Sequence, residues 1–86
     1  TWTIKDTFNF GSVADGNEEV TGVTVSGVAL GDMVLGVASS VDVADLDLTA
    51  NVTAADQVTF QVNNNTGGAI DLATAEYTAL VVRPNW

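Results

Sequence analysis

The stretch DQVTFQVNNNTGGAIDLATAEYTALVV, residues 56–82, decides the fold class of this chain. Val58, Phe60 and Val62 alternate with polar residues, which is the period of a strand with one buried face. The run Asn63–Gly68 is rich in Asn and Gly, which turns favour because these residues tolerate positive φ. A second alternating run then continues to Val82. We therefore predict a β-hairpin over residues 56–82 that turns around Asn63–Gly68.

The same period of two continues through the rest of the sequence, between short clusters of turn-forming residues. The segment 41–50 is interrupted by aspartates and alternates too well for a helix, so we predict a loop that leads into a strand. Asp6 lies among apolar residues of its face and predicts a bulge or bend in the first strand. The residues expected on buried faces are Trp2, Ile4, Phe8, Phe10, Met33, Leu35, Val37, Leu46, Leu48, Ala50, Val52, Val58, Phe60 and Val62. The expected strands are 2–10, 18–26, 32–38, 46–54, 57–63 and 75–83.

Six short strands, each with one apolar face, bury those faces by packing as two antiparallel sheets. We expect an all-β, small antiparallel two-sheet β-sandwich of jelly-roll or Greek-key type, as a single domain over residues 1–86. The last strand contains a continuous apolar run that ends at Val82, which predicts burial on both of its faces. Pro84 then ends the pairing, since it has no N–H to donate.

The composition of the chain is apolar and acidic. Hydrophobic residues make up 47% of the sequence and charged residues 15%, which argues against disorder. The net charge is −9, from 11 acidic residues and two basic ones, Lys5 and Arg83. Nucleic acids and anionic membranes are therefore not expected as partners, because both are bound by clusters of basic residues. The acidity favours solubility, with a basic partner surface or a salty environment as alternatives.

The sequence has no run of apolar residues long enough for a membrane span, and no basic-then-apolar signal segment opens it. Its start at Thr1 is consistent with removal of an initiator methionine. Cysteine is absent, so disulfide and thiolate chemistry are excluded.

Catalysis is not expected. Without His or Cys, the commonest general bases and nucleophile pairs are missing. A Ser–Lys pair would need Lys5, and nothing in the sequence places a serine beside it. Glu18 and Glu19 are adjacent, and adjacent residues of a strand point to opposite faces, so they cannot share a site. We predict that the chain is not an enzyme and binds no cofactor.

An acidic segment is the one candidate for a metal site. Asp42, Asp45 and Asp47 lie in or beside a loop, and oxygen ligands in a loop suit Ca²⁺. Their spacing differs from that of the EF-hand loop, so we favour a solvated acidic turn without metal. Asn51 and Asn64 begin glycosylation sequons, which we interpret as chance matches in a chain without a signal segment.

Two segments carry a resemblance to a known family: GSVADGNEEVTGVTVSGVALGDMVLGV (11–37) and TANVTAADQVTFQVNNNTGGAIDLATAEYTALVV (49–82). They resemble the small β-sandwich virion proteins of tailed bacteriophages, often encoded near the major capsid protein. The matching elements are the Gly-Ser opening, the VTVSGVALGDMVLG hairpin, the ADQVTFQVNNNTGGAIDLAT turn and the last Leu-Val-Val strand. Many members have Pro-Pro where this chain has Ser39-Ser40-Val41, so no contact residue is carried over from that loop.

The resemblance implies a head decoration (cement) protein, which sits on the capsid surface of the virion, commonly as a homo-trimer, and clamps neighbouring capsomers. The implied partners are the major capsid protein and further copies of the chain itself. One alternative is a tail-fibre or adhesin-type module that recognises a host surface glycan. A domain of an extracellular array is another.

The chain ends carry the candidate interaction residues. Trp2 and Trp86 are large aromatic residues near the two termini, and burying such a side chain stabilises by roughly 2–3 kcal/mol. Trp2 shares a face with Ile4 and is expected to join the domain's own core. Trp86 lies beyond Pro84, and we expect it to contact another subunit or the shell.

Overall fold

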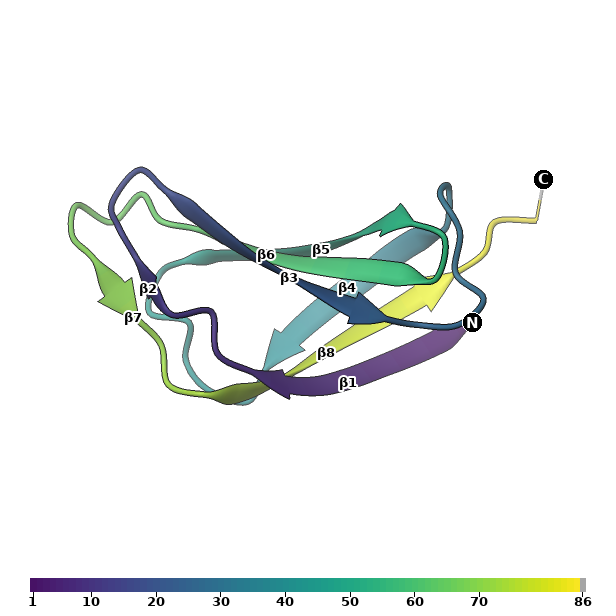
Figure 1. Cartoon of the computed structure of the whole chain (residues 1–86), viewed down its shortest axis with the longest axis horizontal. Helices are drawn as coiled ribbons and strands as arrows, with labels where there is room; N and C mark the ends of the chain where they lie inside the picture. Colours follow the sequence, from purple (N-terminus) through teal and green to yellow (C-terminus); the bar gives the residue numbers. More distant parts are fainter. Residues whose placement is uncertain (86) are drawn as a thin grey trace.

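The structure is a computed structural model that describes residues 1–85. This range folds as an all-β domain whose strands pair antiparallel (Figure 1). No helix within it is long and apolar enough to cross a membrane. The strands are β1 (Trp2–Phe8), β2 (Ser12–Val13), β3 (Glu18–Thr24), β4 (Met33–Ser39), β5 (Asp47–Ala54), β6 (Gln57–Asn63), β7 (Ile70–Asp71) and β8 (Ala75–Val82).

Two three-stranded sheets form the layers of the molecule. The β8 sheet has the order β1-β8-β4, and the β6 sheet has the order β3-β6-β5. The two sheets face one another along an elongated body 43 Å in length, and β2 pairs with β7 at one end of it (Figure 1). The expected all-β antiparallel fold and its six long strands are confirmed, whereas the short β2–β7 pair was not predicted.

The predicted hairpin over residues 56–82 is wrong. β6 lies in the centre of one sheet and β8 in the centre of the other, so the Asn63–Gly68 turn begins a crossing between the sheets. β6 instead forms a hairpin with β5, through the turn at Ala55-Asp56, where Asp56 has φ of 62°. Alternation identifies the buried face of a strand but not its neighbour, because every strand of a sandwich has the same period.

The VTVSGVALGDMVLG segment, residues 23–36, is likewise no hairpin. Its first half ends β3 in the β6 sheet and its second half begins β4 in the β8 sheet. The intervening loop, residues 25–32, therefore crosses from one layer to the other (Figure 1).

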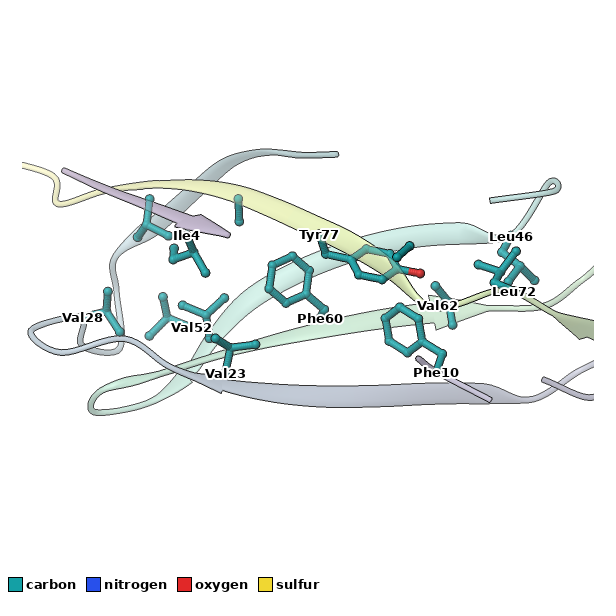
Figure 2. Close-up of a cluster of buried hydrophobic side chains, with 14 of the residues drawn as sticks. Ile4, Phe10, Val23, Val28, Leu46, Val52, Phe60, Val62, Leu72 and Tyr77 are labelled. Atoms are coloured by element: carbon teal, nitrogen blue, oxygen red, sulfur yellow. The ribbon is translucent and has the colours of Figure 1, made fainter. Parts of the chain in front are cut away.

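The core fills the space between the two sheets (Figure 2). Phe60 from β6 and Tyr77 from β8 are fully buried at its centre. The ring of Phe8 stacks on Tyr77 with centroids 4.4 Å apart, and Phe10 meets both rings edge-on. Contacts between aromatic rings in these geometries stabilise by about 0.5–1.5 kcal/mol beyond the area that they bury. The predicted inward faces of β1, β5 and β6 supply Ile4, Val52, Val58, Phe60 and Val62 to this core, and β8 supplies Ala75, Tyr77, Ala79 and Val81.

Three strands differ from expectation, β4 and β8 in their faces and β1 in its regularity. In β4, the pairing with β8 shifts register between Val34 and Gly36, which leaves Met33 and Leu35 exposed and turns Val34 inward. In β1, pairing with β8 is continuous, so the bulge predicted at Asp6 is absent from this strand. In β8, Leu80 is 39% exposed, so the apolar run is buried on one face rather than two. The reason is that no layer covers the outer face of this sheet within residues 1–85.

One buried polar side chain fixes the crossing between β6 and β8. Asn64 is 0% exposed, and its Nδ2 donates to the carbonyl oxygens of Val13 and Gly68, each at 2.8 Å. Its Oδ1 accepts from the backbone N–H and the hydroxyl of Thr66, at 2.9 and 2.7 Å. This amide therefore holds the turn after β6 against β2, and it is enclosed where a glycan acceptor would be exposed.

Candidate functional site

The 25–32 loop lies at the end of the molecule where the N-terminus and the C-terminal segment also lie (Figure 1). It turns at two glycines with positive φ, Gly27 at 98° and Gly31 at 97°. Val28 points into the core and is 1% exposed, whereas Leu30 is 71% exposed. The loop therefore has one residue anchored in the domain and one large apolar residue presented to the outside.

Arg83, just after β8, clamps this loop. Its Nε and Nη2 donate to the two carboxylate oxygens of Asp32, both at 2.9 Å, and Nη2 also donates to the carbonyl oxygen of Gly27 at 2.8 Å. A bidentate pair of this kind fixes both distance and orientation. The Asp32 side chain is only 4% exposed, whereas that of Arg83 is 52% exposed.

The electrostatics of the clamp favour its charged form. The hydrogen bonds from Arg83 lower the pKa of Asp32 below its ordinary value, against the opposing effect of burial, and the N–H of Ala29 contributes in the same direction. Asp32 in turn raises the pKa of Arg83. Both groups therefore stay ionised at neutral pH.

Two further contacts hold the loop from β1 and from the β5–β6 turn. The indole N–H of Trp2 donates to the carbonyl of Ser26 at 3.1 Å, and the Arg83 guanidinium lies 5.1 Å from the centre of the Trp2 ring. Asp56 accepts from the N–H of Gly27 at 2.8 Å and donates its own N–H to the carbonyl of Val28 at 2.9 Å. Trp2 of β1, Arg83 after β8 and Asp56 of the β5–β6 turn thus fix the backbone of the loop.

A loop held in this way suits binding better than chemistry. Leu30 borders a shallow hollow together with Arg83 and Pro84, which is half-buried. Because the loop is already ordered, a partner that buries Leu30 meets little of the usual entropic cost of ordering a flexible segment. The arrangement is that of a preformed apolar contact point.

The sequence-derived candidates are only partly brought together here. Trp2 contacts the loop and packs against the core, and Pro84 lies beside Leu30. Trp86 lies outside the described residues. The roles of Arg83 and Asp32 were missed, although a lone arginine in a chain of net charge −9 is a signal for a specific ion pair.

The candidate catalytic and metal-binding residues are scattered. Lys5 Nζ lies 3.6 Å from the Glu76 carboxylate, and Glu18 accepts a hydrogen bond from Gln61. Asp42 accepts from the N–H of Ala44 at 2.9 Å, as in an ordinary turn. Across residues 1–85, no group of three or more acidic side chains is gathered closely enough to hold a metal ion. The positions of the remaining candidates Asp45, Asp47 and Glu19 are exposed.

Comparisons of the chain with protein-family models, with curated proteins and with solved structures gave no match.

Proposed function

We propose that this chain is a structural capsid decoration (cement) protein, which binds the outer surface of a tailed-phage head and stabilises the shell. The observation that carries the binding role is the 25–32 loop, whose exposed Leu30 is held in place by Arg83, Trp2 and Asp56. The choice of partner rests on the resemblance of residues 11–37 and 49–82 to phage virion proteins.

The physical basis of such a role is mass action. A protein that binds the assembled shell but not its separated subunits stabilises the shell in proportion to its bound fraction. When many copies bind one shell, the shell comes apart more slowly than any single contact between a copy and the shell dissociates. The chain needs no catalytic group for this task, only a preformed surface.

Charge provides a second element of recognition. Both basic residues are engaged within the chain, Lys5 with Glu76 and Arg83 with Asp32. The nine remaining acidic side chains produce the net charge of −9. A basic rim on the shell would therefore attract the chain, and this attraction weakens as salt is added.

The glycan-binding alternative has less support from the geometry. Sugar-binding sites commonly use an exposed aromatic ring as a platform. The rings of Phe8, Phe10, Phe60 and Tyr77 pack against one another in the core, and Trp2 is covered on one side by Arg83.

The test is co-sedimentation of the purified chain with phage heads that lack their decoration protein. We expect Leu30→Asp to weaken binding by about tenfold or more, because an aspartate cannot be buried without a partner. Val20→Asp is the matched control, since Val20 is an exposed apolar residue (56%) on β3, away from the loop. Equal binding by Leu30→Asp and the unmodified chain would refute the role of the loop, and no binding to any head would refute the capsid partner.

A further inference from the structure

The outer face of the β8 sheet is a second exposed surface, separate from the tip of the 25–32 loop. Within residues 1–85, three of the five exposed large hydrophobic residues gather on this sheet: Met33 (43%), Leu35 (57%) and Leu80 (39%). Gly36 is the pairing partner of Leu80, and Met33 is that of Val82. These residues therefore form one continuous apolar strip across β4 and β8, which we call the outer strip.

The outer strip has two projecting leucine side chains, Leu35 and Leu80, and an open space above Gly36. Leu35 and Leu80 border a shallow hollow that also includes Gly36 and Thr78. A Cβ built on Gly36 would meet no atom within 4 Å, so the space above this glycine is empty. The hollow above Gly36 is therefore open to an apolar side chain from a facing surface.

The outer strip is also electrically neutral. Glu76, on the same side of β8 as Leu80, is paired with Lys5 of β1. Asp32, next to Met33, is paired with Arg83. The other nine acidic residues lie in turns, on β3, β5 and β7, or in the groove between β1 and β3: Asp6, Asp15, Glu18, Glu19, Asp42, Asp45, Asp47, Asp56 and Asp71.

From these observations we infer that the outer strip packs against the outer strip of a second copy of this chain, as a two-fold dimer. Two copies that each carry −9 repel one another wherever their unpaired carboxylates meet. A neutral apolar strip removes this obstacle. A basic partner gains nothing here, because its favourable contacts are with the nine unpaired acidic residues elsewhere.

The strip is suited to pairing with itself. In a two-fold contact the same patch serves both copies, so each projecting leucine can meet the open space above Gly36 of the other copy. Two sheet faces pack about 10 Å apart when their side chains interdigitate. A contact of this kind closes at two copies, whereas the trimer implied by the resemblance requires two different patches on each copy.

The test is the mass of the purified full chain by sedimentation equilibrium, from micromolar to submillimolar concentration. We expect a dimer for the unmodified chain, and a dissociation constant raised about 100-fold or more by Leu80→Glu, because two-fold symmetry buries the new charge twice. Gly36→Gln fills the open space and is expected to act in the same direction. Val20→Glu, on the outer face of the other sheet, is the control and leaves the dimer unchanged.

The folding of each variant is checked by far-UV circular dichroism, which should be unaltered because Leu80 and Gly36 are exposed in the single chain. A monomer at every concentration, a trimer, or an equal effect of Leu80→Glu and Val20→Glu would overturn the inference. Shell binding is measured on the same variants. Loss of shell binding by Leu80→Glu without a change in mass would assign the strip to the shell instead, and would leave the capsid proposal standing.

Discussion

Replacing Asn64 by alanine tests whether one buried amide holds the crossing between the two sheets. Its side chain makes four hydrogen bonds, to the carbonyls of Val13 and Gly68 and to two groups of Thr66. The backbone N–H and carbonyl of residue 64 pair separately, with Asn17 and Gly16. Those main-chain bonds survive the substitution, so the change isolates the contribution of the side chain.

The expected cost follows from burial. The bond to Val13 is fully buried, and leaving its carbonyl unpaired costs about 1–3 kcal/mol. The three part-buried bonds contribute about 0.5 kcal/mol each, because Gly68 and Thr66 regain partners or water. The total is about 3 kcal/mol, a large fraction of the stability of a domain of this size. For a chain of this length it corresponds to a fall in Tm of about 12–24 °C.

The assay is thermal and urea unfolding followed by circular dichroism. Asn65→Ala is the control, since the neighbouring side chain is exposed and its loss should change stability by less than about 0.5 kcal/mol. Asn64→Asp keeps the acceptor for Thr66 but not the donor for Val13, and it should be nearly as harmful as alanine. If Asn64→Ala and Asn65→Ala unfold at the same temperature, the amide does not hold the crossing and our account of it is wrong.

Two further predictions concern ionisable groups. The pKa of Asp32 is lowered by Arg83, so its contribution to stability is present above the unfolded-state pKa of about 3.9 and is lost as pH falls through the lower folded-state pKa. Thermal unfolding in acid should show this loss, and Asp32→Asn should reduce it, whereas Asp42→Asn at an exposed site should not. The hydroxyl of Tyr77 is buried without a hydrogen-bond partner within residues 1–85, and burial raises its pKa. Tyr77→Phe should therefore leave the free energy of unfolding unchanged or raise it by up to about 1 kcal/mol, and a fall in this free energy of more than about 1 kcal/mol would reveal a missing partner.

The fold class and about half of the core could be predicted from the sequence, because alternation reports directly on burial. Val58, Phe60 and Val62 are buried as their pattern predicts. Pairing could not be predicted, since β6 and β8 have the same period and differ only in which strands flank them. The register shift beside Gly36 leaves Met33 and Leu35 on the outer face while Val37 packs against the core as predicted, and no periodicity shows where a strand gains a residue.

The candidate site was less accessible to sequence reasoning. Trp2 and Pro84 could be chosen from the sequence because of their residue types. The ion pair that holds the 25–32 loop joins Arg83 to Asp32, which lies 51 positions earlier. Asn64 looked like one of three turn asparagines, and only the burial of its amide distinguishes it from Asn65. Contacts between distant positions carry no local pattern, so a single sequence does not reveal them.

The pairing of β1 with β8 has a consequence for how the chain is made. Trp2 lies opposite Val81, so β1 finds its partner only when β8 has been synthesised. Until then the ribosome carries a nascent chain whose Ile4 and Phe8 have no sheet to join, whereas the β5–β6 hairpin can already close. Long-range pairing of this kind slows folding, because the entropic cost of closing the loop comes before the contacts between the strands can stabilise it. The β8 sheet therefore forms only after residue 82 has been synthesised, and a chain that stops before Ala75 would lack the central strand of this sheet.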